Sequence, residues 1–216
     1  EGIKKVDGIL ADLGVSSHQF DVEERGFSFR FDSEFDMRMN KNDALDAKNI
    51  LQNYSKQELA NVFYNYGELR NSRRIADKII ELRNQLEIKT TTQLINCISD
   101  MVPEKNRNQF LSQVFQALRI EVNDEIESLK QMMLDGVDIL KSEGRFVVLS
   151  YHSLEDRIVK NIFKKGNLNG EIEKDFFGNI LKNMNEINRK VIVASDKEIK
   201  ENSRSRSAKL RVAEKI

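Results

Sequence analysis

Residues 6–21 read VDGILADLGVSSHQFD, and the character of the chain changes halfway along this stretch. The part before Gly14 is mostly apolar, which is typical of a buried strand. After Gly14 comes a polar loop containing Ser16, Ser17, His18 and Gln19. In an open parallel α/β sheet, ligands bind just beyond the carboxyl ends of the strands. Asp12, at the end of this expected strand, is therefore a candidate site residue.

A second unit of the same kind follows later in the chain. Residues 145–151 read RFVVLSY, a β-branched and aromatic run expected for a strand covered on both faces. Ser153 then begins a helix as a candidate cap, and capping is the expected role of Asp156, where an acidic residue also favours the helix dipole. Carboxyl ends of neighbouring parallel strands share one edge of a sheet, so we expect Tyr151, His152 and Ser153 to lie beside Asp12. The alternative for His152 is a structural histidine that bonds a neighbouring backbone group.

The region between these strands is helical in pattern. Ser55 and Glu58 have the spacing of a capping box, and apolar residues recur behind them with helical spacing. We interpret residues 42–108 as an all-helical insertion, and residues 1–41 with 109–216 as the α/β domain. Residues 109–140 also read as helical, and Phe110, Val114, Leu118 and Val122 form an apolar stripe at helical spacing. Residues 166–203 read as a long connection, and residues 190–194 and 209–215 as closing strands at an antiparallel edge.

Several motifs resemble those of the RsmH/MraW methyltransferases. They are DLGVSSHQFD at 12–21, RGFSFR at 25–30, DMRM at 36–39, FQALRIEVNDEI at 115–126, EGRFVVLSYHSLEDRIVK at 143–160 and SRSRSAKLRVAEK at 203–215. The resemblance implies a class I (Rossmann-like) α/β sheet dependent on S-adenosylmethionine (SAM). It also implies methyl transfer to the exocyclic N4 amine of a cytosine in 16S rRNA, at the decoding centre of the small ribosomal subunit.

The sequence departs from the family in one respect. Such folds hold SAM mainly through a glycine-rich loop after their first strand, where glycine lets the backbone approach the cofactor closely. Here only Gly2, Gly8 and Gly14 lie near the start, and the first residue is Glu rather than Met. We therefore expect an N-terminally incomplete sheet that lacks half of the cofactor site. Whether the chain alone is active is left open.

The resemblance assigns roles to residues of the two strand-end loops. It implies that Asp12 and Gln19 contact SAM. Asp12 is also a candidate acceptor for the target amine, and Ser16 and His152 are candidate catalytic residues that grip this amine. The alternative for Asp12 is a helix cap or turn stabiliser. The Asp/Asn-Pro-Pro-aromatic motif of many amino-methyltransferases is replaced here by DLGV.

Candidate RNA contacts combine aromatic rings, which stack on bases, with arginines, which also meet phosphates. The set is Arg25, Phe27, Arg30, Arg38, Tyr151, Ser153, Arg204 and Arg206. Simple packing is an equal alternative for each residue of the RGFSFR stretch. A further cluster at Arg70, Arg73 and Arg74 is a candidate phosphate contact, for which a solvated surface is the usual explanation.

Composition narrows the class of protein. Lys plus Arg and Asp plus Glu number 35 each, so the net charge is zero and any RNA contact must come from a local patch. The single cysteine, Cys97, suits a reducing compartment. We expect no membrane span and no metal site, because a long apolar run and zinc-ligand spacings are both lacking. The expected location is a bacterial cytoplasm, with an organellar relative as the alternative. A homodimer is left open.

Two other functions compete with methyl transfer. A fragment that keeps the substrate half without the cofactor half would be a non-catalytic RNA-binding or ribosome-assembly protein. An α/β hydrolase using Ser16 or Ser17 with His152 is the second alternative. GVSSH does not match the G-x-S-x-G nucleophile elbow, since His18 occupies the place of the last glycine.

Overall fold

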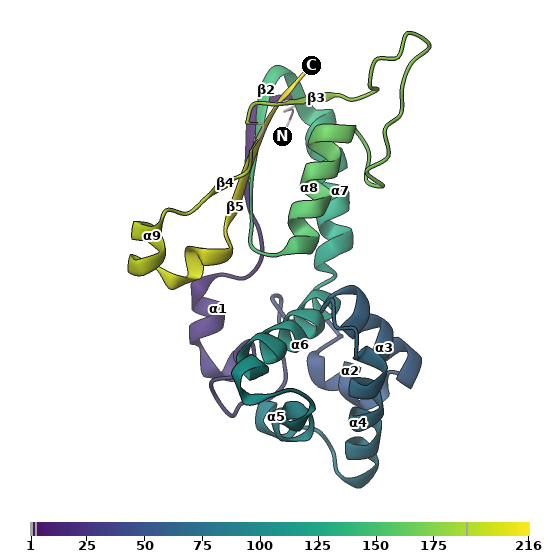
Figure 1. The fold of residues 1–216 in the computed structure, drawn as a ribbon, viewed down its shortest axis with the longest axis vertical. Coiled ribbons are helices and arrows are strands. Elements are labelled where there is room, and N and C mark those ends of the chain that lie inside the picture. Colours follow the sequence, from purple (N-terminus) through teal and green to yellow (C-terminus); the bar gives the residue numbers. More distant parts are fainter. Residues whose placement is uncertain (1, 3, 189) are drawn as a thin grey trace. The chain divides into compact units, whose positions relative to one another are not determined.

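The computed structural model describes residues 2, 4–188 and 190–216. The chain divides into two compact units, Glu1–Gly14 with Ile126–Ile216, and Val15–Glu125. The first unit contains the sheet and the second is built of helices (Figure 1).

The sheet of the first unit has the strand order β1-β2-β5-β3, and β4 also pairs with β5. The strands are β1 Val6–Asp12, β2 Leu140–Ser150, β3 Met184–Glu186, β4 Ile192–Val193 and β5 Lys209–Lys215. β1 and β2 are parallel, and every other pair is antiparallel. The two expected closing strands are confirmed as antiparallel. β5, however, is no edge strand, because it lies between β2 and β3.

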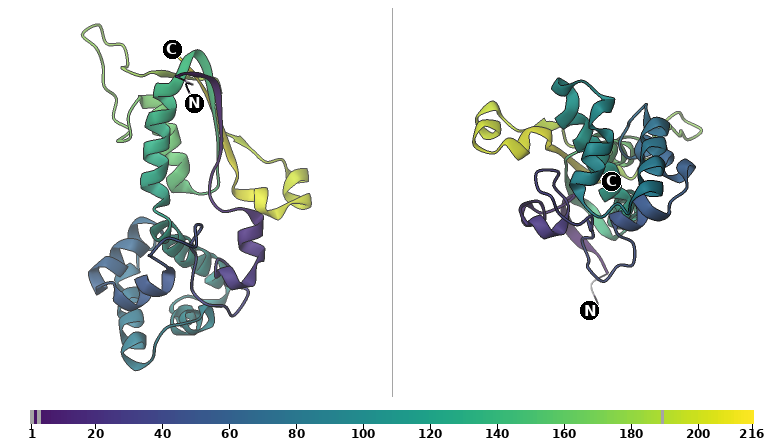
Figure 2. Two further views of the ribbon diagram at one scale, coloured as in Figure 1. Left: turned by 180° about the vertical axis from the view of Figure 1, so that it is seen from behind. Right: turned by 90° about the horizontal axis from the view of Figure 1, so that it is seen from below.

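Helices α7 (Glu125–Ile139) and α8 (Ser153–Lys165) run side by side along one face of this sheet (Figures 1 and 2). Burial accordingly alternates along β2, where Phe146 and Val148 are buried and the residues beside them are less so. Among the described residues, the two faces of this strand are thus covered unequally: one is buried, and Val147 and Leu149 on the other are half-buried. Gly136 lets α7 approach the sheet, since a Cβ there would meet the Phe146 ring at 2.5 Å.

The second unit surrounds one apolar core. Its helices are α1 Ser17–Asp21, α2 Ala47–Asn53, α3 Lys56–Asn65, α4 Ser72–Gln85, α5 Thr91–Ile98 and α6 Arg107–Val122, with 3-10 turns at Glu23–Arg25, Ser99–Met101 and Glu104–Asn106. The predicted capping box of α3 is confirmed: the Ser55 N–H donates to Glu58 Oε2 at 2.7 Å, and the Glu58 N–H donates to Ser55 Oγ. The remaining elements of the first unit are α9 Asp196–Glu201 and a 3-10 turn at Ser203–Ser207.

The helical unit has wider bounds than the insertion expected at residues 42–108. Helix α6 belongs to it because the predicted apolar stripe, including Phe110, Val114 and Leu118, is buried in the same core as α2–α5. The loop before α2 belongs to it too. Phe35 is 1% exposed, and its N–H donates to the Lys89 carbonyl at 3.1 Å.

Within the described part of the chain, every helix falls short of the length and apolar character needed to cross a bilayer.

Candidate functional site

Asp12 and Tyr151 meet at the carboxyl ends of the two parallel strands. Asp12 pairs with Leu149 in the β1–β2 register, so both loops leave the sheet at one edge, as expected. The Tyr151 hydroxyl donates a hydrogen bond of 2.8 Å to Asp12 Oδ1. Asp12 is exposed, and its second oxygen, Oδ2, has no bonding partner among the described residues. The pair therefore presents an oriented carboxylate with one oxygen that no described residue occupies.

Tyr151 is held in its protonated, donating form. Its partial burial disfavours the phenolate, and the neighbouring carboxylates of Asp12 and Glu155 act in the same direction, which together raise the pKa of Tyr151 to about 12. The Tyr151 N–H also donates to Glu155 Oε2 at 2.8 Å. Both ends of the residue are thus fixed by carboxylates, and the hydroxyl stays a donor throughout the neutral range.

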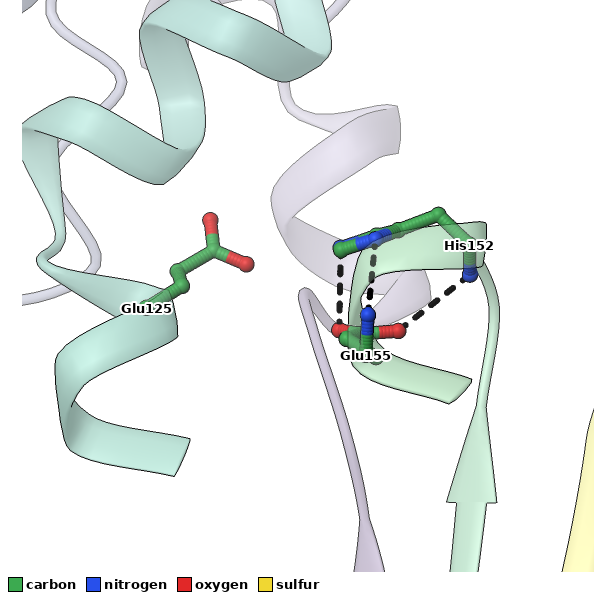
Figure 3. Close-up of side chains that lie close together, drawn as sticks. All are labelled: Glu125, His152 and Glu155. Atoms are coloured by element: carbon green, nitrogen blue, oxygen red, sulfur yellow. Dashed lines mark hydrogen bonds and ion pairs between the residues drawn. The ribbon is translucent and has the colours of Figure 1, made fainter. Parts of the chain in front are cut away.

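His152 forms the N-cap of α8, in an arrangement that Figure 3 shows. The His152 Nδ1 accepts from the Glu155 N–H at 3.4 Å, while Glu155 Oε2 accepts from the His152 N–H at 3.3 Å. Because Nδ1 is an acceptor, the neutral ring carries its proton on Nε2. That atom lies 3.2 Å from Glu155 Oε1 but is poorly aligned for a hydrogen bond. With its side chain 8% exposed, His152 fits the structural alternative better than a catalytic role.

Glu155 is the residue that sequence reasoning missed. It is 3% exposed and accepts from the backbone N–H groups of both Tyr151 and His152, so it holds the loop after β2 in shape. The three-residue spacing from His152 to Glu155 is that of a capping box, with histidine in the place usually taken by Ser or Thr. That spacing is the sequence pattern that could have predicted the role of Glu155.

The loop after β1 continues into the helical unit, where Ser16 caps α1. The Ser16 N–H donates to Gln19 Oε1 at 2.9 Å, and Ser16 Oγ accepts from the Gln19 N–H at 3.3 Å. This capping box accounts for Ser16 without a part in catalysis. The amide nitrogen of Gln19 has no partner among the described residues, so it can donate to a ligand.

The arginines and phenylalanines of residues 25–39 largely hold their own segment together. The Arg25 guanidinium donates to the Met39 carbonyl at 3.2 Å and lies 5.7 Å from the centre of the Phe27 ring. Phe27 is 3% exposed, which favours packing over base stacking for this ring. Arg38 binds Asp36 through two nitrogens, at 2.7 and 3.1 Å. Of the proposed contacts in this stretch, Arg30 is exposed, whereas Arg25 and Arg38 are half-buried and Phe27 is buried.

The remaining proposed RNA contacts lie in the sheet unit. Ser153 is exposed in the first turn of α8, and Arg204 and Arg206 are exposed in the 3-10 turn before β5. A partly buried ion pair involves residues nearby in sequence: Arg211 of β5 donates to Asp156 at 2.7 and 3.2 Å. Asp156 therefore joins α8 to β5, in addition to any part in the cap that was expected of it.

Comparison with known proteins assigns the family. The family described as the MraW methylase family matches residues 1–216. A protein of Bacteroides thetaiotaomicron named ribosomal RNA small subunit methyltransferase H is 54% identical over 213 residues, which cover 99% of this chain and 70% of that protein. A protein of the same name from Flavobacterium johnsoniae is 54% identical over 215 residues, covering 100% of this chain and 71% of that protein. Both findings agree with the motifs and with the mixed sheet, and the chain belongs to the MraW methylase family.

Proposed function

We propose that the chain transfers a methyl group from SAM to the exocyclic N4 amine of a cytosine in 16S rRNA of the small ribosomal subunit, in a bacterial cytoplasm. The observation that carries the proposal is the Asp12–Tyr151 pair at the shared carboxyl edge of two parallel strands. The names of the relatives, which specify small-subunit ribosomal RNA, supply the substrate class.

Asp12 acts on the target amine. The amine is a poor nucleophile because its lone pair is delocalised into the ring, and positive charge develops on the nitrogen as it reacts. Asp12 Oδ2 accepts a hydrogen bond from the amine, stabilises that charge and takes the departing proton. The Tyr151 hydroxyl holds Oδ1, and so fixes the direction in which Oδ2 points.

The chain offers groups that fit the cofactor. The Gln19 amide nitrogen is unpartnered among the described residues, and Gly14 has a φ of 82°, a backbone conformation that a side chain disfavours. SAM supplies an electrophilic methyl group when it is bound. Gln19 contributes a hydrogen bond that holds it, and Glu155 keeps the Tyr151 loop in place around the reacting amine.

The test is methyl transfer from labelled SAM to small subunits that lack the modification, with identification of the nucleoside formed. The enzyme is the complete gene product that contains this sequence. N4-methylcytidine is the expected product. Asp12→Asn keeps the shape but weakens the acceptor and removes the base, so we expect the rate to fall by about 100-fold or more. A different modified nucleoside would overturn the assigned target atom, and no transfer would overturn the proposal.

The competing functions are less well supported. Ser16 and His152 each serve in a capping box of their own helix, which does not suit a hydrolytic nucleophile and base. A non-catalytic RNA-binding role leaves the oriented, partly unpaired carboxylate of Asp12 without a purpose.

A further inference from the structure

The exposed charged residues of helix α8 are all basic. The residues of this helix that are exposed to solvent are Ser153, Arg157, Lys160 and Lys164. They recur every three or four positions, which places them on one side of the helix, opposite buried residues such as Ile162. Arg157, Lys160 and Lys164 together form what we term the basic face of α8.

The two acidic residues of α8 are occupied away from this face. Glu155 is 3% exposed, and it accepts from the Tyr151 N–H at 2.8 Å. Asp156 is partly buried and accepts from the Arg211 guanidinium of β5 at 2.7 Å. Both carboxylates are therefore committed to the loop after β2 and to the sheet. Neither is available to neutralise the basic face.

The other helices of the sheet unit do not share this feature. Helix α7 exposes the acidic residues Glu127, Asp135 and Asp138. Helix α9 exposes acidic residues and lysines in alternation along Asp196–Glu201. A surface that is merely solvated usually mixes the two signs in this way, because opposite charges one turn apart stabilise a helix. The single sign on α8 therefore needs another explanation.

The arrangement of charges on α8 is unfavourable in the protein alone. Lys160 lies three positions from Arg157 and four from Lys164, and like charges at these spacings destabilise a helix. Lys160 and Lys164 form no ion pair within the described part of the chain. The helix dipole favours Lys164, in the last turn, but it does not account for the two earlier cations. A bound polyanion would relieve the repulsion.

The basic face is continuous with the proposed site. Helix α8 begins at Ser153, two positions after the Tyr151 that orients Asp12. With a rise of 1.5 Å per residue, Lys160 lies about 10 Å and Lys164 about 16 Å along the helix axis from Ser153. The face therefore leads away from the site along one helix of the sheet unit, which Figure 1 shows beside α7.

We propose that the basic face of α8 binds phosphates of the RNA strand that carries the target cytosine, on one side of that base. That the polyanion is RNA rests on the proposed function. Lysine and arginine neutralise phosphates and release their counterions, which supplies affinity without reading sequence. These contacts hold the strand in position while its cytosine amine reaches Asp12, and the charge of the face matches that of its ligand.

Removal of two of the charges tests the proposal. Lys160→Ala/Lys164→Ala is made in the complete gene product that contains this sequence. Its affinity for single-stranded oligocytidylate and oligoadenylate is measured without SAM over a range of salt concentrations. Each lost phosphate contact should lower the salt slope by about 0.7, and affinity at low salt should fall by at least about fivefold. The loss should be equal for both sequences, because phosphates carry no sequence information. An unchanged slope, or a loss confined to one sequence, overturns the proposal.

Matched variants separate a local contact from a general effect of charge. Lys160→Arg/Lys164→Arg keeps both charges, so affinity should stay within about twofold. Lys4→Ala/Lys141→Ala removes the same net charge near the amino ends of β1 and β2 and should bind RNA as the parent does. An equal loss of affinity in this control would show that net charge alone matters, which overturns the proposal.

Thermal unfolding checks that the lysines have no structural task. Alanine is the best helix former and the substitution removes a like-charge pair, so the midpoint of Lys160→Ala/Lys164→Ala should stay within about 2 °C of the parent value. A larger fall would assign the two lysines to the stability of α8 and overturn the proposal.

Anionic partners of other classes give a different pattern. Vesicles of phosphatidylglycerol and phosphatidylcholine, and polyglutamate, are tested beside the oligonucleotides. If Lys160→Ala/Lys164→Ala loses affinity for the vesicles or for polyglutamate while its RNA affinity is unchanged, the face serves a lipid or protein surface and the proposal is overturned.

The outcome is independent of the methyl-transfer test. Affinity is measured without SAM, so the basic face can fail while N4-methylcytidine is still formed. Conversely, a protein that binds RNA through this face but transfers no methyl group would retain the proposal for α8 and overturn the proposed reaction.

Discussion

At the scale of single residues, Tyr151 is the group whose role is most sharply testable. Its hydroxyl orients Asp12 without being positioned as the acceptor, so Tyr151→Phe should lower kcat by about tenfold while KM for the RNA changes little. The raised pKa, about 12, means that the donor is complete below the ordinary tyrosine value of 10.0 and is lost only as pH rises toward the folded value. A pH–rate profile of the parent should therefore show no tyrosine limb below about pH 10.

The comparison with Asp12→Asn completes this test. If Tyr151 acts only through Asp12, the double variant should be no slower than Asp12→Asn alone, because the orienting contact has lost its purpose. Additive losses would mean that Tyr151 contacts the substrate itself.

His152 offers a clear separation of structural and catalytic roles. Asparagine is a good N-cap, so His152→Asn should keep both the stability and most of the methyl-transfer rate. His152→Ala removes the acceptor for the Glu155 N–H and should lower the free energy of unfolding by about 1 kcal/mol. Urea denaturation and the transfer assay measure the two effects. A stable but inactive Asn variant would restore the catalytic interpretation of His152.

At the scale of elements, the Asp156–Arg211 pair joins α8 to β5 through side chains that are 14% and 12% exposed. Asp156→Asn removes the carboxylate charge and leaves the partly buried Arg211 guanidinium with a weaker partner there and with Glu186 at 4.0 Å. We expect a loss of about 2 kcal/mol or more in the free energy of unfolding. Arg70→Ala, an exposed change in the other unit, is the control and should alter stability by less than about 0.5 kcal/mol.

The same pair predicts a dependence on pH. Burial by itself raises the pKa of Asp156, but the hydrogen bonds and charges of Arg211 and Lys209 outweigh it and hold that pKa below the usual 3.8. The stabilisation is therefore present above 3.8 and is lost as pH falls through the lower, folded value. In urea titrations, the difference between the parent and Asp156→Asn should shrink at the acid end. A difference that stays constant would show that the pair is not ionised in the folded protein.

Local signals predicted the helices and strands well where they are self-contained. The Ser55–Glu58 capping box, the stripe of α6 and the apolar run of β2 are all confirmed. The hairpin at residues 171–181, whose two arms pair at Lys174 and Ile180, was not predicted from the sequence. Its turn depends on Asp175, which accepts three hydrogen bonds, and a hydrophobic periodicity does not predict such a turn. The assignment of α6 to the helical unit was not predicted either. An apolar stripe indicates that one face of a helix is buried, but it does not indicate which elements bury it.

At the scale of the whole molecule, a net charge of zero means that RNA affinity must come from local patches. Arg73 and Arg74 are exposed in the first turn of α4, which has no acidic residue there and no side-chain cap. Cations are unfavourable at this end of a helix dipole. The double variant Arg73→Ala/Arg74→Ala should therefore raise the free energy of unfolding by about 0.3 kcal/mol. The same variant should weaken RNA binding.

Binding measured over a range of salt concentrations tests this patch. Each lost phosphate contact should reduce the salt slope by about 1. Lys130→Ala is the control, because that ammonium already pairs with Glu127 at 2.6 Å. An unchanged slope in the double variant would assign these arginines to a solvated surface instead.

The amino-acid sequence was enough to predict the family, the class I methyltransferase fold and the local structure of most elements, since motifs, caps and stripes involve residues a few positions apart. Which side chains meet depends instead on tertiary packing. Tyr151 lies 139 positions from the Asp12 that it orients, and Arg211 lies 55 positions from its partner Asp156. Those contacts exist because β1, β2 and β5 pair side by side, and strand pairing depends on how whole elements pack rather than on any local pattern. The same packing places His152 at the N-cap of α8 and leaves Asp12 Oδ2 without a partner among the described residues.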